Sequence, residues 1–242
     1  MNLYFLLEDE KSLLKTLPLW FEHLNFKYCR VADIQEVREN NYILQSGQGV
    51  TQLVTRALFD TIDTIRLNPG KIDMLVVILD AEELDADVRK QEVNEQINKY
   101  CEGGKIDFDI EVLVCNRCFE TWLLGCCGLY PMECPDTQSD FYKYYIHYNV
   151  EEYDPEKMKT PEGEKDTTAK YHFHYLHELL RYRRIRYSKN NTKNVATEKY
   201  FKGIVERVEK TEHLSSFKTF YDFICSLNVD RKGRENKPGP EI

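Results

Sequence analysis

The sequence has no apolar run long enough to cross a membrane. Its longest run, residues 74–79, has six residues, whereas a spanning helix needs roughly 20. The amino terminus reaches Glu8, Asp9 and Glu10 after a short apolar segment, which is not the pattern of a secretory signal or an anchor. We therefore expect a cytoplasmic protein with no membrane association.

The sequence also has fewer basic than acidic residues. Lys and Arg number 33 against 41 Asp and Glu, so the net charge is −8. This balance argues against a protein that coats nucleic acid non-specifically, because such binding depends on many basic contacts. It does not exclude a nuclease, since acidic metal ligands add negative charge and a local basic patch can still bind phosphate.

The eight cysteines lack the regular spacing of a disulfide framework, and a chain of 242 residues has no need of one. We expect mostly free thiols. One alternative is a structural zinc site, because tetrahedral zinc accepts four thiolates at short spacings. Buried free cysteine is the more common case, and three nearby histidines do not share one helix face. The residues in question are Cys115, Cys118, Cys126, Cys127 and Cys134, with His172, His174 and His177.

Strand-like and helical patterns alternate through the first half of the chain. The nearly continuous apolar run at 72–80 is typical of a central parallel strand that is covered on both faces. Pro18 lies inside a helical pattern and predicts a kink or an early end there. The order predicts an α/β domain with a mostly parallel sheet over residues 1–129. The expected strands are 3–8, 42–44, 72–80 and 108–115, and the expected helices are 11–24, 50–67, 85–101 and 119–125.

The second half has a different character. Residues 130–170 are expected to form a linker and acidic loop, because 150–170 contains seven acids, two prolines and few large apolar side chains. Residues 171–230 are predicted to form a helical carboxyl-terminal region, and the charged, Gly- and Pro-containing segment 231–242 a disordered tail. The expected helices are 171–187, 197–210 and 215–227.

Acidic residues stand at the end of three of the strand-like runs. Glu8 follows the first, Asp80 and Glu82 the third, and Glu120 comes just beyond the fourth. Residues past the carboxyl ends of parallel strands converge on one crevice, and Mg²⁺ prefers such oxygen ligands. The pattern therefore indicates a metal site for phosphodiester chemistry. The alternative is helix capping, which suits Asp9 and Glu10 well.

A basic run with no acid lies between residues 179 and 197. Guanidinium groups bind phosphate bidentately, and tyrosines within the run, Tyr182 and Tyr187, can stack on unpaired bases. The run predicts a nucleic-acid-binding segment, with a solvated helix face as the alternative. Lys189 is the candidate for neutralising phosphate charge in a transition state. The basic residues are Arg181, Arg183, Arg184, Arg186, Lys189 and Lys193.

The order strand, Glu8, helix, strand, helix, strand, Asp80-Ala81-Glu82 resembles a Toprim domain. The segment Asn116-Arg117-Cys118-Phe119-Glu120-Thr121-Trp122-Leu123-Leu124 is similar to the N-x-x-F-E-x-W-L-L signature of small Toprim-like proteins of the RloB type, related to overcoming-lysogenization-defect nucleases. The resemblance covers residues 1–129, with a weaker continuation at 187–189 and 215–227.

The resemblance implies a nuclease that uses Mg²⁺, or Mn²⁺ in its place, to cut DNA or RNA, including tRNA. It assigns Glu8, Asp80, Glu82 and Glu120 as metal ligands and catalytic residues, to which the basic run adds Lys189 as a catalytic candidate. It also implies an anti-phage defence system with an ABC-like ATPase partner, and it leaves homo-oligomers open.

Two positions depart from the Toprim pattern. Asp9 replaces a glycine after the first glutamate, and Glu82 replaces the second aspartate of the D-x-D pair. They support an alternative hypothesis, a catalytically silent interaction subunit that docks onto the ATPase. A primase or a topoisomerase is disfavoured, because the chain is short and offers no evident tyrosine nucleophile.

Overall fold

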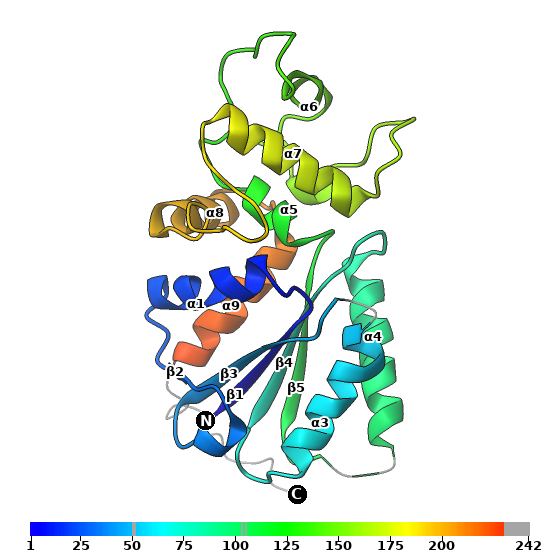
Figure 1. The fold of residues 1–242 in the computed structure, drawn as a ribbon, viewed down its shortest axis with the longest axis vertical. Helices are drawn as coiled ribbons and strands as arrows, with labels where there is room; N and C mark the ends of the chain where they lie inside the picture. Colours follow the sequence, from blue (N-terminus) through cyan, green and yellow to red (C-terminus); the bar gives the residue numbers. More distant parts are fainter. Residues whose placement is uncertain (50–51, 103, 105, 230–242) are drawn as a thin grey trace, which may run out of the picture.

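The computed structural model describes residues 1–49, 52–102, 104 and 106–229. It contains a five-stranded parallel sheet with the strand order β2-β3-β1-β4-β5, flanked by helices and followed by a helical carboxyl-terminal region (Figure 1). The predicted fold class is therefore confirmed. The strands are β1 Leu3–Leu7, β2 Cys29–Arg30, β3 Asn41–Ser46, β4 Met74–Asp80 and β5 Asp109–Cys115.

Strand β1 lies at the centre of the sheet and sets its register. Leu7 pairs with Ser46 of β3 on one side and with Ile78 of β4 on the other. The next pair of strands is aligned so that Asp80 of β4 lies beside Cys115 of β5. Because all these strands are parallel, the residues that follow them emerge at one edge of the sheet.

The two faces of the sheet are covered by different helices (Figure 1). Leu3, Phe5 and Leu7 belong to a large core that includes residues of α1 and α9, whereas Tyr4 and Leu6 belong to a second core with α3 and α4. This alternation follows from the two-residue period of a strand. On the first side lie α1 Ser12–His23, α5 Phe119–Leu124, α8 Glu198–Lys210 and α9 Ser215–Asn228; on the second lie α3 Leu58–Arg66 and α4 Ala86–Cys101.

Several local predictions differ from the structure. Helix α1 continues through Pro18, so an early end there is wrong. The segment Leu53–Ala57 is a π-helix that runs into α3, and the two-residue strand β2 was not predicted. The predicted helix start at Val50 and the tail over 231–242 lie outside the described residues.

The carboxyl-terminal helices α8 and α9 match their predicted ranges closely. Helix α7 Thr168–Tyr182 starts earlier and ends earlier than predicted, so most of the basic run follows the helix rather than belonging to it. The remaining short helices are η1 Ile34–Glu36, α6 Tyr142–His147 and η3 Pro155–Lys157.

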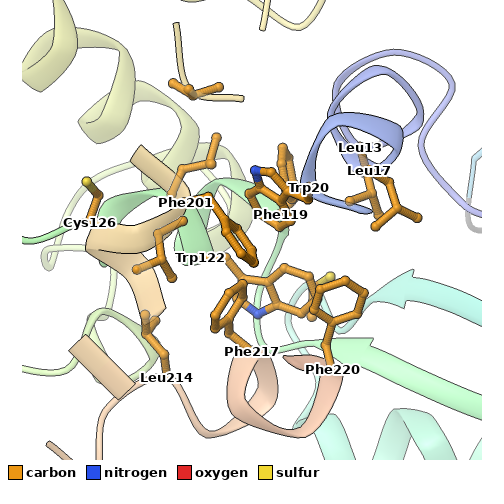
Figure 2. Close-up of a cluster of buried hydrophobic side chains, with 14 of the residues drawn as sticks. Leu13, Leu17, Trp20, Phe119, Trp122, Cys126, Phe201, Leu214, Phe217 and Phe220 are labelled. Carbon is orange, nitrogen blue, oxygen red and sulfur yellow. The ribbon is translucent and has the colours of Figure 1, made fainter. Parts of the chain in front are cut away.

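An aromatic cluster joins the sheet domain to the carboxyl-terminal helices (Figure 2). Trp20 of α1 packs against Phe119 of α5 and Phe201 of α8, with ring centroids 5.6 and 5.1 Å apart. Trp122 of α5 packs against Phe217 of α9 at 5.4 Å. Both tryptophans are completely buried, so α5, which carries Glu120, is held from several sides.

The acidic segment is not a uniformly solvated loop, in contrast to the prediction for 150–170. Val150, Asp154, Glu156 and Met158 are buried. The Glu156 carboxylate accepts hydrogen bonds from the backbone N–H and hydroxyl of Ser216 and from the hydroxyl of Ser215. It therefore satisfies one free amide group at the start of α9, whose N-cap residue makes no side-chain cap.

We expect Glu156→Ala to lower the free energy of unfolding by about 2–3 kcal/mol, because buried hydrogen bonds to a charged group are lost and their donors stay buried. Urea unfolding of the variant measures this change. Glu152→Ala is the matched control, since Glu152 is exposed in the same segment. Equal stability of the two variants would contradict the capping role of Glu156.

Candidate functional site

Two of the predicted acidic residues meet directly at the edge of the sheet. Glu8 continues the ladder after β1, and its N–H donates to the carbonyl of Ile78 at 2.9 Å. The Oε2 atom of Glu8 in turn accepts the N–H of Asp80, the last residue of β4, at 2.8 Å. The parallel register thus brings together two carboxylates that are 72 residues apart.

Glu82 lies in a turn just beyond β4, and this turn is fixed by the turn after β5. The N–H of Glu82 donates to the carbonyl of Arg117 at 2.8 Å, while the guanidinium of Arg117 donates to the carbonyl of Leu84 at 2.9 Å. Glu82 and Arg117 both have left-handed backbones, with φ of 54° and 72°. Such conformations are costly for residues other than glycine, and they concentrate at functional sites.

Glu120 occupies the first turn of α5 and is 2% exposed. Its Oε1 atom accepts a hydrogen bond from the Tyr187 hydroxyl at 2.9 Å and lies 3.9 Å from Nζ of Lys189. Lys189 is half-exposed, and Nζ also stands 5.5 Å from the centre of the Phe173 ring. The Glu120 carboxylate therefore lies beside Lys189, the lysine predicted to act in catalysis.

All five predicted catalytic residues line one pocket of about 690 Å³, which we call the acidic pocket. Its other wall comes from α7, whose first turn is tied to the loop after β4 by hydrogen bonds from Thr168 to the Glu83 carboxylate. The lining residues on and just before α7 could not be predicted, because only tertiary packing brings α7 to the sheet edge; they include Thr167, Lys170, Phe173 and His174. Asp9 and Gln48, from the loops after β1 and β3, also line the pocket.

Burial and mutual repulsion raise the pKa of two of the carboxyls. The pKa of Asp80 is well above its ordinary value because the group is buried, and because the charges of Glu8 and Glu120 lie nearby. Burial likewise raises the pKa of Glu8 to about 7, with the Glu82 charge adding to the shift. Conversely, the Glu120 charge raises the pKa of Lys189 against the opposing effect of burial. The carboxyls of the acidic pocket thus resist simultaneous ionisation when no cation is bound.

The donor set of the acidic pocket suits a hard divalent cation, because it consists of carboxylate oxygens under mutual repulsion. As the side chains stand, the described residues contain no group of three or more His, Cys, Asp or Glu arranged to hold a metal ion. Side-chain rotation is therefore required before three of these carboxylates can share one cation.

Comparisons with known proteins decide nothing about the family. No family model, no curated protein and no solved structure matches this chain. Within the part of the chain that the structure describes, no helix is both long enough and apolar enough to cross a membrane. The Toprim resemblance and the identity of any partner therefore stay predictions.

The predicted basic run divides into residues with different surroundings. The guanidinium of Arg181 pairs with Asp140 at 3.0 Å and with Glu178 at 3.4 Å, and that of Arg183 donates to the carbonyl of Gly128. Arg184, Arg186 and Lys193 are exposed. Tyr187 is buried against Glu120, so its predicted stacking on a base is wrong.

The described residues also give no support to the zinc alternative. All eight cysteines are free, and they belong to no group arranged to hold a metal. Cys115 and Cys118 are buried, Cys118 at the acidic pocket, and burial raises the pKa of both thiols. They serve as small apolar core residues, which is the more common role of a buried free cysteine.

His172 is a completely buried core histidine on α7. Nε2 stands 3.0 Å from the carbonyl of Met158, so Nε2 carries the proton, and Nδ1 accepts from the Thr121 hydroxyl at 2.8 Å. Burial lowers the pKa of His172 to about 4. This contact links α7 to the turn of α5 that carries Glu120.

We expect His172 to make the protein less stable in acid. The unfolded chain binds the proton near pH 6.5 and the folded chain near pH 4, so the stability is fully present above pH 6.5 and is lost as the pH falls through this window. At 1.36 kcal/mol for each pH unit the loss approaches about 3 kcal/mol near pH 4. Urea unfolding at several pH values measures it, and the difference between wild type and His172→Gln isolates it. A pH-independent difference would contradict this assignment.

Proposed function

We propose that this protein is a divalent-metal-dependent nuclease of the Toprim kind that cuts phosphodiester bonds in DNA or RNA. One observation carries the proposal: Glu8, Asp80, Glu82 and Glu120, which follow three different strands, line a single pocket together with Lys189. Carboxylates beside lysine side chains suit an electrophilic metal and an anionic substrate. Helix capping does not account for Glu8 and Asp80, because both side chains line the acidic pocket.

Glu8, Asp80 and Glu82 would hold the cation, with Glu120 as a further ligand. When bound, a divalent cation lowers the pKa of water and stabilises the charge on a leaving oxygen. Asp80 orients Glu8 by donating its N–H to Oε2, and among the described residues no hydrogen bond engages the other oxygen of Glu8. Lys189 contributes positive charge beside a bound phosphate, and Glu120 with Phe173 fixes the position of its Nζ.

The cellular context of this proposal comes from the Toprim resemblance. The resemblance suggests an anti-phage effector that is regulated by an ABC-like ATPase partner. The cytoplasmic location follows from the sequence expectation above, and the oligomeric state is left open. The substrate class within nucleic acid is open between duplex DNA, single strands and tRNA, because metal-assisted phosphodiester cleavage is similar in all three.

Incubation of the purified protein with plasmid DNA, single-stranded DNA and total tRNA tests the proposal. Each substrate is tested with Mg²⁺, with Mn²⁺ and with EDTA. We expect cleavage of at least one substrate with a metal ion and none with EDTA. If the protein cuts none of these substrates, either alone or together with its proposed ABC-like ATPase partner and a phage trigger, it is not a nuclease.

A silent interaction subunit is the second candidate. It is favoured by the lack, among the described residues, of any three-ligand group that could hold a metal as the side chains stand. Asp9 in place of glycine and Glu82 in place of aspartate also favour it. Phage protection that survives both Glu8→Ala and Asp80→Ala would support docking rather than cleavage.

A further inference from the structure

A second pocket, of about 460 Å³, opens beside the carboxyl-terminal end of α7. We call it the arginine pocket. Three guanidinium side chains and one imidazole line it, in a chain whose net charge is −8. Its lining residues are His177, Arg181, Arg184, Ile185, Arg186 and Tyr187.

The charges of this pocket are only partly neutralised by the protein itself. Arg181 pairs with Asp140 and Glu178, and His177 lies 3.0 Å from Glu178. Among the described residues, no carboxylate pairs with Arg184 or Arg186. Two exposed guanidinium groups therefore stand at one pocket without a counter-ion, which is the arrangement that binds a phosphate.

Arg184 occupies a backbone position that favours glycine. Its φ is 57°, and the bonds from Arg184 N–H to the carbonyl of Arg181 and from Ile185 N–H to the carbonyl of Leu180 end α7 in a Schellman motif. An arginine is strained at this position. The strained backbone at Arg184 adds to the interest of its side chain, which lines the arginine pocket.

The arginine pocket and the acidic pocket share a wall. The ring of Tyr187 lines the arginine pocket, while its hydroxyl donates to Glu120 of the acidic pocket at 2.9 Å. The two pockets are thus linked by the hydrogen bond between Tyr187 and Glu120. A strand with phosphates at regular intervals can place one phosphate in each.

We propose that Arg184 and Arg186 bind a backbone phosphate of the nucleic-acid strand whose scissile phosphate enters the acidic pocket. This inference rests on the proposed nuclease function and adds an anchor for its substrate. The anchor recognises a single strand through phosphate charge, so DNA and RNA are both accommodated.

The test combines Arg184→Gly with Arg186→Gln in the full chain. Glycine suits the left-handed backbone at residue 184, so the double variant keeps its fold, as thermal unfolding verifies. Fluorescence anisotropy in EDTA measures its binding to a short labelled DNA strand and to an RNA strand of the same sequence, over a range of KCl concentrations. Arg30→Gln is the control, because Arg30 is exposed on β2, outside both pockets.

We expect the double variant to bind about tenfold more weakly than wild type, and the slope of log affinity against log salt to fall by roughly 0.7, the value for one lost phosphate contact on a single strand. Arg30→Gln should bind as wild type does. Equal affinities of the double variant and wild type, or no salt-dependent binding by wild type, would overturn the anchor. Binding that depends on the arginine pair, by a protein that cuts no substrate with a metal ion either alone or with the ATPase partner and a phage trigger, would uphold the phosphate site and refute the nuclease.

Discussion

Asp80→Asn and Glu8→Gln are each expected to reduce metal-dependent cleavage at least about a thousandfold, or roughly 4 kcal/mol in transition-state stabilisation. Both substitutions keep the size of the side chain and remove one carboxylate charge from the acidic pocket. The loss should appear in kcat/KM for whichever substrate the wild type cuts, because the missing ligand stabilises charge in the transition state.

The matched control for these variants is Asp60→Asn. Asp60 is an exposed carboxylate that pairs with Arg56 and lies outside the acidic pocket. We expect it to cut at the wild-type rate. If Asp80→Asn and Glu8→Gln also retain wild-type activity, the acidic pocket has no part in catalysis, and the cleavage belongs to another site or to a contaminant.

Glu8→Gln should stabilise the fold when no metal is present. The folded pKa of Glu8 is about 7 against 4.5 for the ordinary group, so its contribution to stability is full below pH 4.5 and is lost as the pH rises through 7. At pH 8 this amounts to about 3 kcal/mol, which solvent screening at the half-buried carboxyl reduces to about 2 kcal/mol. The expected rise in Tm is roughly 4–8 °C for a chain of this length.

Addition of Mn²⁺ should make the wild type more stable than Glu8→Gln. A cation that binds only the folded wild type raises its Tm, whereas Glu8→Gln has lost a ligand and gains little. Thermal unfolding of both proteins in EDTA and in Mn²⁺ measures the crossover, with Asp60→Asn as control. A Glu8→Gln variant that is less stable than wild type in EDTA would show that the Glu8 charge is already balanced within the protein.

The sheet and its acidic edge could be predicted because their cause is local. Apolar runs that end in Glu8 and Asp80 predict buried strands, and parallel strands deliver their final residues to one edge. The contacts of Glu120 with the carboxyl-terminal half could not be predicted in the same way. Its partners Tyr187 and Lys189 reach it only because α7 packs across the edge, and that packing leaves no periodic signal in the sequence.

The same limit explains the errors in the second half of the chain. Composition predicted a solvated acidic segment, yet Asp154 and Glu156 are buried because they bind free amide groups near the start of α9. Tyr187 is typical of a base-stacking residue in its basic context, but its hydroxyl is used inside the protein. Composition cannot reveal a polar group that is buried with its partner.

The most direct test of the account is to locate Mn²⁺ by anomalous diffraction in crystals of the wild-type protein grown with the ion. The account predicts a strong anomalous peak in the acidic pocket, within coordination distance of Glu8, Asp80 and Glu82, that is absent in Asp80→Asn crystals. A well-ordered pocket without a peak at saturating Mn²⁺, or a peak that persists in Asp80→Asn, would contradict the assignment of these carboxylates as a metal site.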